Sequence, residues 1–86
     1  MFTIREFIEA FKNNDRVKRY QIHCTCLMPS QTNIEVNRTA GEVYRRDLYI
    51  DTIEEQMKDY LDFEVMTITF REDLNAVVLL TFEPRR

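Results

Sequence analysis

The sequence predicts a small α+β domain in which an antiparallel sheet carries two helices packed on one face. Three observations lead to this fold class. The chain has 86 residues, enough for one hydrophobic core, and 44% of them are hydrophobic, including six Phe and four Tyr. Apolar residues recur at helical spacing near the N-terminus and alternate with polar residues further on. Helical and extended segments follow one another in the order α-β-β-β-α-β-β, which is typical of a sheet with helices on one side.

The first predicted element is a helix over residues 3–13. Thr3 and Glu6 have the spacing of a capping box, in which two side chains satisfy free backbone amides at a helix start. The apolar residues that follow at helical spacing are Ile4, Phe7, Ile8 and Phe11. The helix is predicted to end at 13–15, because Asn and Asp side chains there compete for backbone hydrogen bonds.

Three strands are predicted next, over residues 17–28, 34–37 and 42–50, as an antiparallel meander. In the first strand one face carries Tyr20, Ile22, Cys24, Cys26 and Met28, and the strand ends at Pro29. The single glycine of the chain, Gly41, belongs to the segment 38–41 between the second and third strands. A tight hairpin turn is predicted there, because glycine adopts positive φ at low cost.

A second helix is predicted from Asp51 or Thr52 to about Leu61, and two further strands over 63–71 and 76–83, joined by a turn at 72–75. The helix has an apolar stripe of Ile53, Met57, Tyr60 and Leu61. The uninterrupted apolar run 76–80 indicates a central strand covered on both faces. We expect one domain spanning residues 1–86, with 83–86 as a frayed end.

Composition argues against several function classes. A net charge of −3 and a pI near 5.1 do not fit general coating of nucleic acid, and one glycine leaves no Gly-rich phosphate loop. No apolar run approaches the roughly 18–20 residues that span a membrane. The first residues read as a helix start rather than a leader, and two cysteines fit a reducing compartment. We therefore expect a cytoplasmic protein with no membrane partner.

Candidate chemical groups are few. Cys24 and Cys26 share one strand face while His23 points to the other, and a structural zinc needs four ligands. Nucleophilic catalysis needs a base within reach of a nucleophile, and His23 is the only imidazole. We expect two buried, unlinked thiols, no metal, no cofactor, no catalytic residue and no enzymatic activity.

Charge distribution is the main clue to a partner. Residues 51–64 contain six acidic residues against one lysine, a net charge of −5, whereas residues 1–50 carry +2. The acidic residues expected to bind a partner are Glu54, Glu55, Asp59 and Asp62. The alternative is that this run is only the solvated face of an amphipathic helix.

A second candidate patch lies on the predicted strand 42–50. Its members are Tyr44, Arg45, Arg46 and Tyr49, residue types enriched at protein interfaces. Because Arg45 and Arg46 must face opposite sides, we expect an edge strand. The alternatives are a bulge that re-aims one arginine, or packing of that arginine beside Asp47 or a helix carboxylate. An edge strand also makes a homodimer possible.

These features favour a non-catalytic protein-binding module, an inhibitor or adaptor that acts by occlusion through the acidic helix and the edge strand. The alternative is a nucleic-acid-binding domain that uses Arg38, Arg45, Arg46, Tyr44 and Tyr49, assisted by Lys18 and Arg19.

Three kinds of protein have a similar architecture. The α-β-β-β-α opening resembles double-stranded-RNA-binding domains, although 51–55 (Asp-Thr-Ile-Glu-Glu) stands where that family has a lysine-rich phosphate clamp. The full order resembles small acidic secretion chaperones, which are longer and dimeric. Small acidic α+β domains of this size are also similar to phage-encoded inhibitors such as anti-CRISPR proteins. These likenesses imply a phage or mobile-element inhibitor, or a chaperone, as concrete versions of the protein-binding function.

Overall fold

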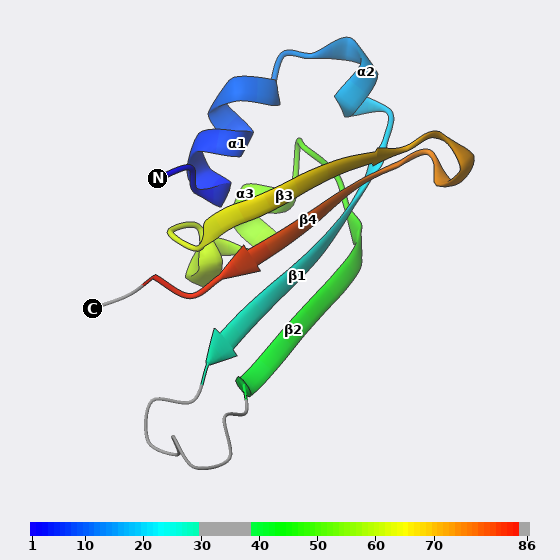
Figure 1. The fold of residues 1–86 in the computed structure, drawn as a ribbon. Coiled ribbons are helices and arrows are strands. Elements are labelled where there is room, and N and C mark those ends of the chain that lie inside the picture. The colour runs from blue at the N-terminus through cyan, green and yellow to red at the C-terminus, as the bar shows by residue number, and fades with distance from the viewer. Residues whose placement is uncertain (30–38, 85–86) are drawn as a thin grey trace.

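The computed structural model describes residues 1–29 and 39–84, and these form helices and a four-stranded sheet (Figure 1). The elements are α1 (Ile4–Phe11), α2 (Asp15–Lys18), β1 (Gln21–Pro29), β2 (Thr39–Leu48), α3 (Ile53–Gln56), the 3-10 helix η1 (Lys58–Tyr60), β3 (Glu64–Arg71), the 3-10 helix η2 (Glu72–Leu74) and β4 (Ala76–Phe82). The predicted α+β class is confirmed. The strand predicted at 34–37 lies outside the described residues.

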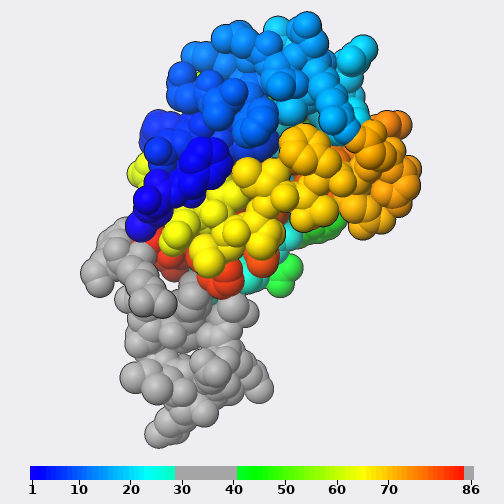
Figure 2. All heavy atoms as spheres, turned by 45° about the horizontal axis from the view of Figure 1, so that its top comes forward, coloured from blue at the N-terminus to red at the C-terminus, as the bar shows by residue number. Residues whose placement is uncertain are grey.

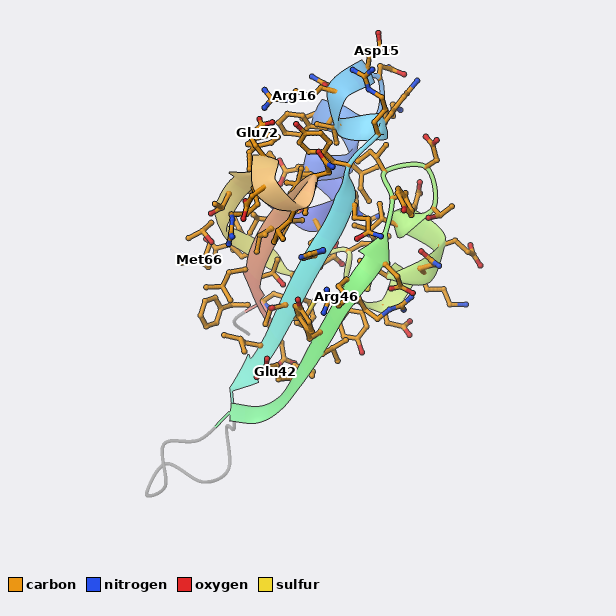
Figure 3. The ribbon with its side chains drawn as sticks, turned by 90° about the vertical axis from the view of Figure 1, so that its right-hand side faces the viewer. Asp15, Arg16, Glu42, Arg46, Met66 and Glu72 are labelled. Atoms are coloured by element: carbon orange, nitrogen blue, oxygen red, sulfur yellow. The ribbon has the colours of Figure 1, made fainter. Side chains whose placement is uncertain are left out.

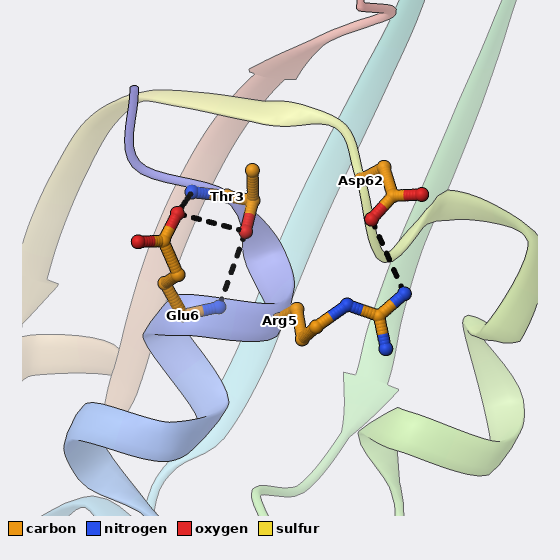
Figure 4. A network of polar contacts seen from close by, with 4 residues as sticks. All are labelled: Thr3, Arg5, Glu6 and Asp62. Atoms are coloured by element: carbon orange, nitrogen blue, oxygen red, sulfur yellow. Dashed lines mark hydrogen bonds and ion pairs between the residues drawn. The ribbon is translucent and has the colours of Figure 1, made fainter.

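Helix α1 begins at the predicted capping box (Figure 4). The Glu6 amide donates to Thr3 Oγ1 at 3.2 Å, and the Thr3 amide donates to Glu6 Oε1 at 3.0 Å. The Ile4 amide donates to the Phe63 carbonyl at 3.0 Å, and the Arg5 guanidinium forms a 3.2 Å ion pair with Asp62. The helix start is therefore fixed by its own side chains and by the segment before β3.

Helix α2 occupies Asp15–Lys18, where the sequence predicted the first strand from Val17 onward. That prediction is wrong for 17–20. The Asn14 side chain accepts hydrogen bonds of 3.0 Å from the amides of Arg16 and Val17. Asn14 thus starts a new helical turn instead of only ending the previous helix. Val17 belongs to that turn and is buried.

The sheet is mixed, so the prediction of an antiparallel sheet is wrong. Its strand order is β2-β1-β4-β3, with β1 and β4 parallel and the other two pairs antiparallel (Figure 1). The β3–β4 hairpin joins β1 through β4, and this places the apolar run 76–80 in the middle of the sheet. The predicted central position of that strand is confirmed, and the more polar β3 takes an edge.

The two faces of the sheet differ in burial. The inner face belongs to the hydrophobic core and carries Ile22, Cys24, Cys26, Leu48, Val65, Val77 and Leu79. The same core contains side chains of α1, α2 and α3, among them Phe7, Val17 and Ile53. The outer face carries Thr25, Leu27, Tyr44, Thr67, Thr69, Val78, Leu80 and Phe82, all of which lie outside the core. Full cover of β4 on both faces is therefore wrong, because Val78, Leu80 and Phe82 are only half-buried.

The second predicted helix is shorter than expected. It ends at Gln56, because Met57 leaves the helical conformation (φ −117°, ψ 28°), and a 3-10 turn follows at Lys58–Tyr60. Met57 and Leu61 are nevertheless buried, as the apolar stripe predicted. A segment this short has little helical stability of its own, so tertiary packing decides its exact form.

The predicted turn role of Gly41 is also wrong. Gly41 lies inside β2 opposite Met28, and no described glycine has a positive φ. The left-handed residue is instead Asn75 (φ 50°, ψ 49°), which follows η2 in the connection between β3 and β4. Asn tolerates this conformation better than most residues, because its short side chain can hydrogen-bond locally. Arg38, the first residue of the predicted turn, lies outside the described residues.

Candidate interaction surfaces

Strand β2 forms one edge of the sheet, as predicted for residues 42–50. Its register with β1 puts Tyr44 opposite Thr25 on the outer face and Arg45 opposite Cys24 on the inner face. The register then shifts, so that Arg46 and Asp47 both lie opposite His23. Arg45 Nε donates to Asp47 Oδ1 at 3.1 Å. The edge, the bulge and the contact with Asp47, which the sequence left as alternatives, therefore occur together.

The outer face has an apolar centre with tyrosines beside it. Leu27, Leu80 and Phe82 are half-buried, whereas Tyr44 is 52% exposed. Tyr49 is 41% exposed, and its hydroxyl accepts a 3.3 Å hydrogen bond from Gln21 Nε2. The sequence had used the run 76–80 only as a strand signal. Its alternate members Val78 and Leu80 turn out to form part of a surface, which their period-two spacing could have indicated.

His23 lies on the outer face and is only 7% exposed. Its Nε2 is buried and has no hydrogen-bond partner among the described residues. Burial lowers the pKa of His23, and the positive charges of Arg46 and Arg71 lower that pKa further. The imidazole is therefore neutral at pH 7, which removes a charge from the middle of this face.

The acidic surface consists of Glu54, Glu55, Asp59 and Asp62, which are all exposed. Asp62 forms the ion pair with Arg5, and the other three form no ion pair with a described residue. Ile53 of α3 points into the core on the inner side of the sheet. Tyr44 and Arg46 lie on the outer face of β2, so the acidic surface and the β2 patch, which the sequence singled out as two candidate patches, belong to different elements.

The basic residues proposed for nucleic acid are also divided. Arg46 is on β2, whereas Lys18 belongs to α2 and lines a shallow groove with Ile8, Lys12, Asn13, Ile50, Asp51 and Glu54. This groove contains charges of both signs. Arg19 is exposed at the end of α2, and Arg38 lies outside the described residues.

The thiols of Cys24 and Cys26 face the core, with their sulfur atoms 3.7 Å apart and no disulfide between them. The hydrogen bond with Cys26 raises the pKa of the Cys24 thiol, and burial adds to this effect. Within residues 1–29 and 39–84, no three His, Cys, Asp or Glu side chains are placed to hold a metal ion. None of the helices described is long and apolar enough to cross a membrane.

Comparison with models of known protein families, with curated proteins and with solved structures finds no match for this chain. The surfaces described above are therefore the basis for inferring its function.

Proposed function

We propose that this protein is a non-catalytic protein-binding module whose main contact surface is the outer face of the sheet. The observation that carries the proposal is the half-buried row Leu27, Leu80 and Phe82 next to the exposed Tyr44. Apolar side chains with Tyr and Arg beside them fit the buried centre of protein interfaces, which is more apolar than the rest of the surface and is enriched in aromatic residues and Arg. The proposal takes the helices to pack on the inner face alone, so that a partner has access to the outer face.

A protein partner is favoured over nucleic acid by the charges of this face. Arg46 and Arg71 are matched by Glu42 and Glu64, whose register positions also put them on the outer face. Arg71 is further held by Asp73, with 2.7 Å between Nη2 and Oδ2. Binding of a phosphate backbone requires an excess of positive charge, and the charged residues described on this face carry no such excess.

The acidic surface is the second proposed contact. Because it lies on the inner side of the sheet, a partner with Lys or Arg side chains could bind there while the outer face is occupied. Two separate surfaces of different chemistry suit an adaptor, and one surface alone would suffice for an inhibitor that acts by occlusion. An inhibitor encoded by a phage or mobile element is one concrete version of this proposal.

The outer-face contact is tested by capture from a nuclease-treated extract of the native cells with the immobilised protein. Leu80→Glu and Tyr44→Glu each place a charge in the proposed contact, whereas Glu9→Lys changes an exposed residue of α1. We expect the two outer-face variants to lose a captured protein that wild type and Glu9→Lys retain. Capture that both outer-face variants leave unchanged, or capture that nuclease abolishes, contradicts the proposal. Circular dichroism establishes that each variant is folded.

The acidic contact is tested separately with the Glu54→Lys/Glu55→Lys double variant. We expect loss of a captured protein whose binding by the wild type also weakens as salt rises, because exposed charge pairs are screened. A captured set that is insensitive to both salt and this variant would remove the acidic surface from the proposal.

A further inference from the structure

The two edges of the sheet are not equally open. At the β3 edge, the Val65 amide donates to the Phe2 carbonyl at 2.7 Å, and Thr3 forms a bridge with Glu64. The N-terminal residues therefore occupy the start of that edge. Strand β2 covers Thr39–Leu48, and among the described residues it pairs only with β1. The backbone amides and carbonyls on its other side bind no residue that the structure describes, and another strand can pair with such groups.

The side chains on the outer face of β2 include one acidic and one basic residue on either side of a tyrosine. Glu42 and Arg46 lie on the same strand (Figure 3), and Tyr44 is midway between them in the sequence. Glu42 pairs in register with Leu27 and Tyr44 with Thr25, so both point outward, and Arg46 lies opposite the outer-face residue His23. Neither Glu42 nor Arg46 forms an ion pair with a described residue. Two opposite charges thus flank a half-exposed tyrosine, and neither is held in an ion pair with a described residue.

We propose that two copies of this chain pair through their β2 edges, antiparallel, about a two-fold axis that passes through Tyr44. In this register Glu42 of each copy lies opposite Arg46 of the other, and the two Tyr44 side chains lie opposite each other. Cross-strand pairs of opposite charge and of aromatic residues stabilise antiparallel sheets. Charged residues on an edge normally prevent pairing, but this order makes them attract a second copy.

Other registers are less favourable. An axis perpendicular to the sheet keeps outer-face residues opposite outer-face residues, so the axis must pass through a residue and not between two. An axis through Arg45 puts two arginines directly opposite each other. An axis through Val43 puts Glu42 opposite Tyr44 and leaves Arg46 without a carboxylate. Only the axis through Tyr44 compensates both charges.

Such a dimer joins two four-stranded sheets into one continuous sheet and doubles the number of strands across the outer face. The inference concerns self-association and does not rest on the proposed function, which its experiments leave untouched. A contact limited to two strand edges is small, so we expect a dissociation constant on the order of 10–100 µM.

Sedimentation equilibrium of the full chain from roughly 5 to 500 µM tests the dimer. Glu42→Arg and Arg46→Glu each place like charges opposite each other, and each should weaken the dimer at least about tenfold. An equimolar mixture of the two variants restores complementary charges at both positions, so it should form a heterodimer that neither variant forms alone. Glu54→Arg, a charge change of the same kind on α3, is the control and should dimerise like the wild type.

The register is tested by disulfide trapping with diamide. Tyr44→Cys puts two thiols directly opposite each other and should give a covalent dimer, whereas Glu42→Cys puts them about four residues apart, too far to bridge. The wild type, whose two cysteines are buried, gives the background. A wild type that stays monomeric at the highest concentration overturns the proposal. So do charge variants that dimerise like the wild type, a mixture that fails to associate, or trapping at 42 in place of 44.

Discussion

The hydroxyl of Tyr20 donates a 2.8 Å hydrogen bond to the carboxylate of Glu72, a residue 52 positions later in the chain. Arg16 of α2 forms an ion pair with the same carboxylate, and its Nε donates to the Tyr20 hydroxyl oxygen at 3.1 Å. Figure 2 shows the resulting contact, with the end of the β3–β4 hairpin in orange against α2 in light blue. Three side chains therefore join α2, the residue just before β1, and η2.

Loss of this hydrogen bond should destabilise the protein. Tyr20 is 9% exposed, so Tyr20→Phe keeps the buried ring but removes the donor, and we expect a loss of about 1 kcal/mol in the free energy of unfolding. Urea denaturation measures it. Tyr60→Phe is the matched control. The Tyr60 ring packs against Phe63, and its hydroxyl has no hydrogen-bond partner among the described residues. Equal losses in both variants would contradict the assigned role of the Tyr20 hydroxyl.

The capping box should contribute to stability through the side chain of Thr3. Thr3→Ala removes the acceptor for the Glu6 amide, and we expect a loss of about 1 kcal/mol in the free energy of unfolding. Thr3→Ser keeps the hydroxyl and should remain near the wild type. Thermal unfolding followed by circular dichroism distinguishes the two, and an alanine variant as stable as the serine variant would argue against the cap.

Titration of His23 should make the protein less stable in mild acid. Burial and the nearby Arg46 and Arg71 lower the pKa of His23 from its ordinary 6.5, so the unfolded chain takes up this proton at higher pH than the folded chain. The neutral imidazole contributes fully to the free energy of unfolding above pH 6.5, and this contribution is lost as the pH falls through the folded-state pKa. We expect His23→Gln to lose less stability than the wild type between roughly pH 7 and 5.5. An NMR titration gives the pKa of the single imidazole directly, and a value of 6.5 or higher would refute this explanation.

Gly41 and Asn75 should respond in opposite ways to alanine. Gly41→Ala places a Cβ 3.4 Å from Met28 Cε in an ordinary strand conformation, so we expect no loss, or a gain of about 0.5 kcal/mol from reduced chain entropy. Asn75→Ala must hold φ at 50° without a side-chain amide and should lose about 1 kcal/mol, whereas Asn75→Gly should not. Chemical denaturation of the three variants checks the order. Greater damage at 41 than at 75 would show that the hairpin strain has been assigned to the wrong residue.

The fold was predictable where one local pattern was strong. The capping box and apolar stripe of α1, the alternation in β1 and the apolar run of β4 each depend on neighbours in sequence. Prediction failed where a short segment had two options of similar energy. Asn14 can end one helix or begin another. The second predicted helix is formed only over Ile53–Gln56, because Met57 departs from helical geometry.

The sheet face of the candidate residues on β2 was predictable, but their arrangement with residues of other strands was not. The edge position of Tyr44 and Arg46 and the opposite facing of Arg45 followed from strand periodicity. The contribution of Leu80 and Phe82 to the same face depends on the pairing of β1 with β4, residues more than fifty positions apart. No local pattern specifies such a pairing.

The sequence by itself determined the fold class, the burial of the cysteine pair and the charges and aromatic residues available for binding, because these follow from composition and from short-range periodicity. Only the tertiary structure decided which of those residues share a surface. The parallel contact between β1 and β4 leaves β2 at an edge and groups Tyr44 with Leu80, while Ile53 packs into the core and leaves Glu54 and Glu55 exposed on α3. The physical reason is that strand order is set by burial of the most apolar strand between two neighbours, a property of the whole sheet.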